Sequence, residues 1–579
     1  MNCRNHNVKK LISNAQMNTN SNNDSRCDIA LIHPPGVFQK EKYAIFSPPW
    51  SLRHVGSTSY IGRYPIGPSG AIMPLGFTTM KNFIEDNSNY SVNIFNFSFK
   101  FDVLEIMSER FKHIYKGDKS IISDRIEKRY ASEIELNLKD LRADLFAVSL
   151  HWLNFSQGAI QILKLLKQAH PRSYTVMGGL TATYFKDEIM NLFPFIDFLI
   201  AGDGCIPLLK LIEQIKGSKH FFKVPNLLYR EGGEIKKGPK RLLNDFKYVQ
   251  KDDEPFNPIS AARGCPLQCI TCGGSKYASQ NLCNYVKIQA FSVESIMRKL
   301  FNLVKQHKEE SRAAIFLIHD PFVTLGKKSW EALLKEIKRS RLNVRLRVEF
   351  FLPHSAKDIS HIAENVPGSL IDISPESMDV NVRTFHKNLK YPNRELIMNM
   401  DVINNIDSLS MGIWFLAGLA RDTKQSIDKT LSFIKSYYKK IKNKKENIIQ
   451  YNELLFIDPG SLAFDSPDKY GYELINRSFL SHMQSFEMPI FKYQINYRTR
   501  HCTRDQIFAL FLYMHNKMNK IYYENDIIDK QLYDRVTLYN KFLKEYATEY
   551  DKALLEKNIK TRNKYFEKIG NSFRSELEK

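Results

Sequence analysis

Apolar, strand-like stretches alternate with helix-like stretches in two separate series along this chain of 579 residues. In the first series, strands are expected at 28–33, 91–97, 144–150, 174–179 and 197–200. In the second, they are expected at 259–262, 313–318, 344–350, 370–374, 410–416 and 448–456. This alternation predicts βαβ units and parallel sheets. The predicted fold class is therefore α/β: a doubly wound domain, then a partial (β/α)6 barrel, then an α-helical region at the C-terminus.

The same patterns divide the chain into five parts. The first is too polar to bury a core and is expected to be disordered, and the third is a charged linker whose hairpin turns at Gly232 and Gly233. A Gly-, Pro- and aromatic-rich stretch at 37–73 is too long for a simple loop and is expected to be an insertion that caps a ligand. The predicted boundaries are 1–27 (lead), 28–220 (first domain), 221–256 (linker), 257–465 (barrel) and 466–579 (helical region).

Three cysteines fall within eight residues, Cys265, Cys269 and Cys272, spaced C-x3-C-x2-C. A structural zinc site normally takes four ligands, often as two C-x2-C pairs. Three thiolates in one loop suit a [4Fe–4S] cluster with one iron left without a protein ligand. The loop follows the first predicted barrel strand, at the end where barrel active sites gather. Chance spacing, or zinc with a distant fourth ligand, remains the alternative.

Four further motifs stand at predicted strand ends in this half of the chain, and with the cysteine spacing they resemble those of radical S-adenosylmethionine (SAM) enzymes. They are His-Asp-Pro-Phe at 319–322, Pro-Glu-Ser at 375–377, Gly-Leu-Ala-Arg-Asp-Thr at 418–423 and Asp-Pro-Gly-Ser at 458–461. Two features depart from the family: Thr271 replaces the usual aromatic residue before the third cysteine, and the Gly-Gly-Glu turn is absent.

The resemblance implies that SAM chelates the open iron and is cleaved reductively to a 5′-deoxyadenosyl radical. It also implies SAM contacts from Gly273, Gly274, Glu376 and Arg421, although Glu376 could instead cap a helix and Arg421 could be solvated. Asp320 would either touch substrate or brace the barrel mouth. No catalytic residue is assigned beyond the three cluster cysteines.

The first domain carries Pro-Leu-Gly at 74–76, Ala-Asp-Leu-Phe-Ala-Val-Ser at 143–149, Val-Met-Gly-Gly at 176–179 and Gly-Asp-Gly at 202–204. This order resembles the cobalamin-binding domain that precedes many radical SAM barrels, a flavodoxin- or Rossmann-like fold. The resemblance implies cobalamin beyond the strand ends, against the residues Ser149, Gly178, Gly179 and Gly202.

The first turn of this domain supplies His33 in a His-x-x-Gly pattern, but Leu31 stands where a cobalamin-ligating histidine would have its Asp partner. We therefore expect no histidine beneath the cobalt. A flavodoxin-like domain that has lost its ligand is the alternative.

The net charge of +22 is spread through the whole chain, so a Lys-rich surface is favoured over a nucleic-acid interface. No apolar run is long enough to span a membrane, and the other five cysteines are scattered singly, which predicts a cytoplasmic protein.

The combined resemblance implies a cobalamin-dependent radical SAM enzyme that transfers a methyl group to an unactivated carbon of a small molecule or natural product. A flavodoxin- or ferredoxin-type protein would supply electrons. The alternatives are a radical SAM enzyme that does not use cobalamin, one that catalyses a cyclisation or rearrangement, and a non-catalytic iron–sulfur or zinc protein.

Overall fold

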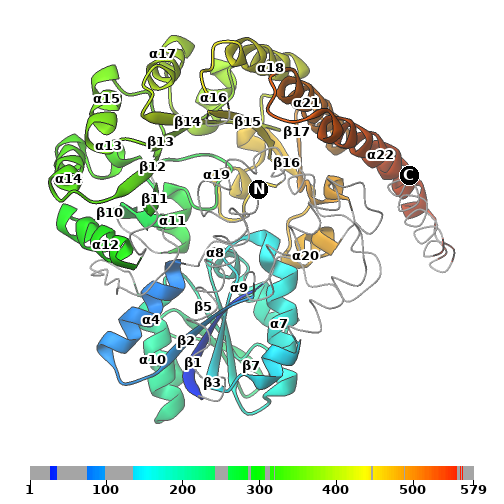
Figure 1. Cartoon of the computed structure of the whole chain (residues 1–579). Helices are drawn as coiled ribbons and strands as arrows, with labels where there is room; N and C mark the ends of the chain where they lie inside the picture. Colours follow the sequence, from blue (N-terminus) through cyan, green and yellow to red (C-terminus); the bar gives the residue numbers. More distant parts are fainter. Residues whose placement is uncertain are drawn as a thin grey trace.

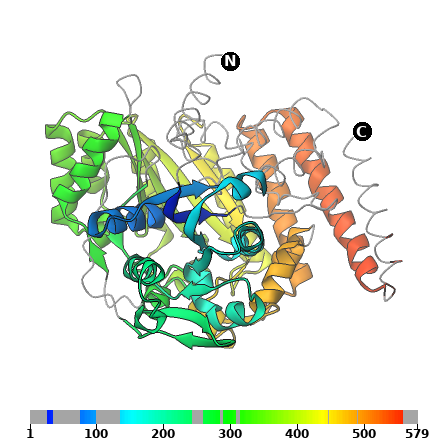
Figure 2. The same ribbon diagram turned by 90° about the horizontal axis from the view of Figure 1, so that it is seen from below.

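The computed structural model describes residues 26–34, 75–97, 135–241, 258–283, 288–306, 313–318, 320–444, 447–454, 456–487 and 490–556, with positions 558, 561 and 564. The insertion expected at 37–73 and nearly all of the polar lead lie outside these residues. Within them, a mainly parallel sheet and a parallel sheet are followed by a mainly helical C-terminal region (Figures 1 and 2).

The first sheet has the strand order β2-β1-β3-β4-β5, with all neighbours parallel. Its strands are β1 (Cys27–His33), β2 (Val92–Asn96), β3 (Ala143–Ser149), β4 (Tyr174–Gly178) and β5 (Phe198–Ile200). Its helices are α4 (Leu75–Asn87), α7 (Ser156–Ala169), α8 (Leu180–Tyr184), α9 (Lys186–Leu192) and α10 (Cys205–Lys216), and the 3-10 turn η1 is Leu153–Phe155. The strand order reverses between β1 and β3, and ligands of such sheets bind at that point, beyond the carboxyl ends of the strands.

The segment expected to be a linker instead extends this sheet. After the turn η2 (Phe221–Lys223), β6 (Leu227–Glu231) pairs antiparallel with β5, and β7 (Glu234–Lys237) pairs with β6. The hairpin turns at Gly232 and Gly233 as predicted, and both have positive φ, 61° and 84°, as a two-residue hairpin loop requires. The predicted linker therefore contains the edge of the first domain.

The second sheet has six parallel strands in the order β15-β14-β13-β12-β11-β8, which matches the predicted partial barrel. The strands are β8 (Pro258–Ser260), β11 (Ala313–Ile318), β12 (Val344–Phe350), β13 (Ser369–Glu376), β14 (Leu409–Ala417) and β15 (Ile448–Glu453). The first predicted strand is split, because β9 (Ala262–Arg263) leaves the barrel to pair with β10 (Gln289–Ala290).

Helices cover the outer side of the barrel (Figure 1). They are α12 (Val293–Gln306), α14 (Lys327–Arg339), α15 (Ala356–Asn365), α17 (Asn393–Asn404) and α18 (Lys424–Tyr438). The other helices of this half are α11 (Lys276–Leu282), which contacts α8 of the first domain, α13 (Pro321–Thr324) and α16 (Val380–Lys387). Alternate residues of β12, such as Val348, are buried against the outer helices, which leaves Arg345, Arg347 and Glu349 on the inner face.

The C-terminal region is mostly helical but contains a two-stranded antiparallel ribbon that the sequence patterns did not predict. Its elements are α19 (Leu462–Asp465), η3 (Asp468–Tyr470), β16 (Tyr472–Leu474), α20 (Phe479–Glu487), η4 (Phe491–Gln494), β17 (Tyr497–Thr499), α21 (Arg504–Glu524) and α22 (Lys530–Leu554). Helix α21 begins at a reciprocal capping box formed by Thr503 and Gln506. No helix of the described residues has the length and apolar character needed to cross a bilayer.

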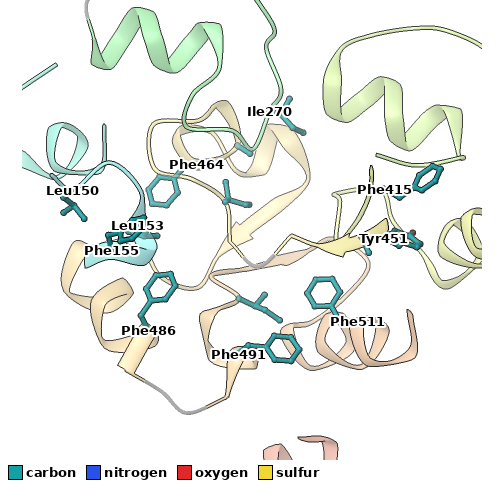
Figure 3. Packing of buried hydrophobic residues seen from close by; sticks show 14 of the residues in the cluster. Leu150, Leu153, Phe155, Ile270, Phe415, Tyr451, Phe464, Phe486, Phe491 and Phe511 are labelled. Carbon is teal, nitrogen blue, oxygen red and sulfur yellow. The ribbon is translucent and has the colours of Figure 1, made fainter. Parts of the chain in front are cut away.

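One buried apolar cluster joins the two domains and the C-terminal region. Figure 3 shows its side chains in a continuous path from Phe155 of the first domain, past Ile270 and Phe464, to Phe491 and Phe511. A core that crosses a domain boundary in this way fixes the carboxyl edge of the first sheet relative to the barrel.

Candidate active site

Backbone hydrogen bonds fasten the cysteine loop to two distant parts of the chain. The N–H of Ile270 donates to the carbonyl of His386 at the end of α16 (3.0 Å), and the Ile270 carbonyl accepts from the N–H of Ala463 (2.8 Å). The N–H of Asp458 donates to the carbonyl of Thr271 (3.1 Å). The loop is therefore held from both sides, by the end of α16 and by the segment between β15 and α19.

The sulfurs of Cys265, Cys269 and Cys272 interact electrostatically with one another. Burial raises the pKa of all three thiols, that of Cys269 to about 12, so without a ligand they are protonated. The N–H of Gly274 lies 3.3 Å from the Cys272 sulfur, which places a donor at that ligand.

Three thiols and no other donor in the loop fit an iron–sulfur cluster better than a single ion. Among the described residues, no three Cys, His, Asp or Glu side chains are grouped closely enough to hold one metal ion. A cubane cluster binds each thiolate at a different iron, so its ligands need not converge on one point. The donor set therefore fits a cluster with one open iron.

Gly273 and Gly274 allow other parts of the protein to approach the loop closely. A Cβ at Gly273 would lie 2.8 Å from the Cβ of Asp458, whose carboxylate accepts the Gly273 N–H at 2.9 Å. A Cβ at Gly274 would lie 3.6 Å from the ring of Trp152, which comes from the first domain. The SAM contacts of these glycines remain predictions. Asp458 belongs to the motif at 458–461, while Trp152 is a neighbour that sequence patterns did not single out.

Glu376 has an unusual backbone and a buried partner. Its φ is +65°, a left-handed conformation that costs a non-glycine residue about 1–3 kcal/mol. The pairing of β13 with β14 shifts register between Ile373 and Glu376. The Glu376 carboxylate lies 3.0 Å from the ammonium of Lys387, so it forms an ion pair at the barrel mouth.

Other charged groups line the inner face of the barrel. Arg347 donates to the carboxylate of Asp372 (2.5 Å), which also accepts from the indole N–H of Trp414 (2.9 Å). Glu349 accepts from the hydroxyl of Ser374 (3.0 Å), and burial raises the pKa of this carboxyl. The arginines of β12 therefore face a polar interior.

Two of the residues that the sequence motifs suggested, Arg421 and Asp320, differ in their exposure to solvent. Arg421 is exposed, and its guanidinium lies 3.9 Å from the centre of the Phe385 ring; a role in binding SAM remains a prediction. Asp320 is fully buried and accepts from the N–H groups of Phe322 (3.0 Å) and Phe351 (2.9 Å). Asp320 thus fixes backbone at the strand ends, and its two predicted roles, contact with substrate and bracing of the barrel mouth, stay predictions.

The candidate cobalamin residues lie together along the carboxyl edge of the first sheet. Ser149 and Gly178 are partners in neighbouring strands. Gly179 has φ +114°, and a Cβ there would lie 2.5 Å from the carbonyl of Leu150. Gly202 has φ +89° and donates its N–H to the hydroxyl of Thr183 (2.9 Å). Glycine is required at 179 by backbone packing, and cobalamin contact by these residues remains a prediction.

Two histidines lie at the point where the strand order reverses. His33 is 9% exposed, and its Nδ1 has no hydrogen-bond partner among the described residues. His151 is open to solvent, yet surrounding protein lowers the pKa of its ring to about 4, as it does for His33. Both rings are neutral at pH 7.

The carboxyl edge of the first domain directly faces the cysteine loop. Arg263, just before the loop, forms an ion pair of 2.5 Å with Asp203 of the first domain, and the ring of Trp152 lies where a Cβ at Gly274 would meet it at 3.6 Å. Two sites expected from separate stretches of sequence therefore meet at one interface.

A flavodoxin-like domain that packs its carboxyl edge on the mouth of a six-stranded partial barrel is the layout of cobalamin-dependent radical SAM enzymes, and the predicted fold is confirmed. The radical SAM methyltransferase TsrM from Kitasatospora setae, solved with cobalamin and a [4Fe–4S] cluster, matches with a TM-score of 0.56. The match covers 95% of this chain and 99% of that chain at 10% identity.

The cobalamin-dependent SAM radical enzyme OxsB, solved with aqua-cobalamin and SAM, matches with a TM-score of 0.54. That match covers 92% of this chain and 74% of that chain at 13% identity. At such low identity these two likenesses establish the fold alone.

Among curated proteins, an uncharacterized methyltransferase of Pyrococcus horikoshii is 25% identical over 242 residues, which is 39% of this chain. The match spans half the length of that relative. No protein-family profile matches the chain.

Proposed function

We propose that this protein is a cobalamin-dependent radical SAM enzyme that transfers a methyl group to an unactivated carbon of a small-molecule substrate. The observation that carries the proposal is the ion pair between Arg263, just before the cysteine loop, and Asp203 at the carboxyl edge of the first sheet. This ion pair places a three-thiol loop next to the edge at which doubly wound sheets bind ligands. The two similar solved enzymes hold a cobalamin, one with a [4Fe–4S] cluster and one with SAM.

Each group has residues that suit it. Cys265, Cys269 and Cys272 would hold the cluster, which supplies the electron that cleaves SAM. Glu376 and the glycines 273 and 274 would contact SAM, with Arg421 as a further candidate. Cobalamin, as methyl carrier, would lie against the edge that contains Ser149, Gly178, Gly179 and Gly202, beside the neutral rings of His33 and His151.

The remaining contribution of the chain is to orient the substrate and exclude water. The inner face of the barrel presents Glu349, Arg347 and Trp414, which can bind a polar small molecule. The interdomain core described above closes the site, and a closed site protects a radical from competing reactions.

The chemistry of such an enzyme indicates its electron donor and its cellular compartment. A cluster of this kind needs a low-potential reductant, so we include a flavodoxin- or ferredoxin-type partner in the proposal. All seven cysteines among the described residues are free thiols, which suits the reducing cytoplasm.

The test is anaerobic purification and reconstitution with iron and sulfide, followed by assays of iron, cobalt and 5′-deoxyadenosine after reduction with SAM. We expect four irons per chain, bound cobalamin and SAM cleavage. Single replacement of Cys265, Cys269 or Cys272 by Ala should abolish cleavage, because each removes a cluster ligand. Cys502→Ala, in the C-terminal region, is the matched control and should keep it.

Three results would contradict the proposal in different ways. Zinc in place of iron, or no cleavage by the reduced wild type, would remove the enzyme assignment. Cleavage without bound cobalamin would select a radical SAM enzyme of another kind. Activity that survives in any one of the three loop variants would contradict the ligand assignment.

A further inference from the structure

A buried ion pair lies beside the cysteine loop. Lys387 is the last residue of α16, and its ammonium lies 3.0 Å from the carboxylate of Glu376. The side chains are only 4% and 13% exposed, and the ammonium also donates to the carbonyl of Ser374. Enclosing two charges is costly, and their attraction offsets that cost only when the geometry is good and further hydrogen bonds are made.

The backbone places this pair against the central cluster cysteine. His386, the residue before Lys387, accepts the N–H of Ile270, the residue after Cys269 (3.0 Å). The Lys387 ammonium is near enough to Cys269 to favour its thiolate, and Glu376 is near enough to oppose it. Lys387 therefore favours the thiolate form of Cys269, and Glu376 disfavours it.

Lys387 remains a cation in this setting. Burial alone would lower its pKa, but the charges of Glu376, Cys269, Tyr391 and Glu349 act the other way, and the net shift is upward. The ammonium also interacts electrostatically with Cys265 and His386, so the titratable groups around it come from the cysteine loop, β12, β13, α16 and the segment after α16.

Glu376 depends on Lys387 for its position. A non-glycine residue with φ +65° persists only where its surroundings hold it. The described contacts that hold it are the pairing with Phe415 of β14 and the ion pair with Lys387. Without the Lys387 ammonium, the largely buried carboxylate of Glu376 would be free to leave its present position.

We propose that Lys387 is a positioning residue for both cofactors of the barrel: its ammonium fixes the Glu376 carboxylate where SAM would bind, and it stabilises the negative charge that a cluster gains on reduction. The inference rests on the proposed function, because it requires a cluster on the three cysteines. The step is the uptake of one electron by that cluster from an external reductant, and no bond is broken in it.

The test compares the reduction potential of the reconstituted cluster among four variants, by redox titration followed by electron paramagnetic resonance. Lys387→Met removes the charge and keeps the length of the side chain, and Lys387→Arg keeps the charge. Glu376→Gln removes the opposing charge. The matched control is Lys327→Met, which removes a lysine that pairs with Asp358 on the outer helices (2.7 Å).

The expected shifts have opposite sign. Lys387→Met should lower the potential, because the reduced cluster loses a nearby cation, and Glu376→Gln should raise it. Lys387→Arg and Lys327→Met should match the wild type. Lys387→Met and Glu376→Gln should each weaken SAM binding about tenfold, the usual scale for partners of a metal site. The SAM-induced change in the spectrum of the reduced cluster measures this binding.

A purely structural role predicts a different result. If both changes shift the potential in the same direction, or leave it unchanged with four irons bound, the inference is overturned. If Lys387→Met loses its cluster, Glu376→Gln still decides, because the inference requires its potential to rise. A wild type that binds no cluster would remove the proposed function itself, whereas a wild type that cleaves SAM with unaltered variant potentials would remove this inference alone.

Discussion

Asp422 is buried and Asp458 is half-buried, and removal from solvent raises the pKa of each carboxyl group to about 6. Both serve to fix a loop. Asp422 accepts the N–H groups of Gly418 and Leu419, each at 3.0 Å, and a hydroxyl hydrogen bond from Ser426 at 2.8 Å. Individual side chains thus hold the strand-end loops of the barrel in shape. Because these carboxyl groups have raised pKa values, their ionisation lowers the stability of the folded protein, and this effect depends on pH.

The first prediction follows from the raised pKa of Asp422. Between about pH 4 and pH 6 the folded protein keeps a proton that the unfolded chain has lost, so stability falls as pH rises through this window. Asp422→Asn removes the titrating carboxyl group, and with it this fall in stability, and keeps an acceptor oxygen. Between pH 4 and pH 7 the difference in unfolding free energy, variant minus wild type, should therefore rise by about 2–3 kcal/mol.

Thermal unfolding of the two apoproteins at several pH values would measure this difference. Above pH 6 the two stability curves should run parallel. Curves that run parallel over the whole range would show that Asp422 does not titrate between pH 4 and 6.

Residue patterns predicted the three cysteines but did not identify the groups that act on them. The cysteines are close together in sequence, and their spacing is itself the signal. Lys387 and Asp458 reach the loop only through the fold, from positions far downstream, and each alone is indistinguishable from a surface lysine or a turn aspartate. Asp458 did stand in one of the motifs compared above, which was the only available signal.

At the scale of elements, the β16–β17 ribbon ties the C-terminal region to the barrel. The hydroxyl of Tyr497, in β17, lies 2.9 Å from the carbonyl of Gly418 and 2.8 Å from that of Leu454. A Cβ at Gly418 would lie 2.3 Å from this hydroxyl, so only glycine allows the approach. The ribbon therefore joins the ends of β14 and β15.

The second prediction concerns this hydroxyl. Tyr497→Phe keeps the ring and leaves two carbonyl groups without their shared donor, so the free energy of unfolding should fall by about 1–3 kcal/mol. The melting temperature of the apoprotein measures it. Tyr523→Phe, a change at a 37% exposed residue of α21, is the control and should have little effect. Equal melting temperatures for both variants would contradict the bridging role.

The sequence patterns predicted the parallel strands, but they did not predict the β16–β17 ribbon. Strands such as β11 and β12 are marked by apolar or alternating residues over six and seven positions. Strands β16 and β17 have three residues each, too few to display a period. Their pairing depends on contacts between segments separated by α20.

At the scale of the whole molecule, the two domains meet through charge as well as through the shared apolar core. Arg263 and Asp203 form the ion pair described above, with side chains 17% and 5% exposed. Tyr184 of the first domain and Tyr277 of α11 both donate to the carboxylate of Asp465 (2.7 and 2.8 Å). The interface therefore has directional contacts that fix how the domains face each other.

The third prediction tests the ion pair. Arg263→Met leaves the Asp203 carboxylate buried without its cation, which should cost about 3–5 kcal/mol. Limited proteolysis of the full chain should then cut between the domains more rapidly. The double variant Arg263→Met with Asp203→Asn removes both charges and should recover most of the loss. No recovery would show that Arg263 contributes through packing alone.

The anchors of the cysteine loop also set an order of events during synthesis. The loop is complete only when His386, Asp458 and Ala463 have been made and have folded around it, and all three leave the ribosome long after Cys272. Domains generally fold as units as they emerge. The nascent chain therefore has its three thiols before the segments that hold their loop in place, and insertion of the proposed cluster would have to wait until most of the protein has been translated.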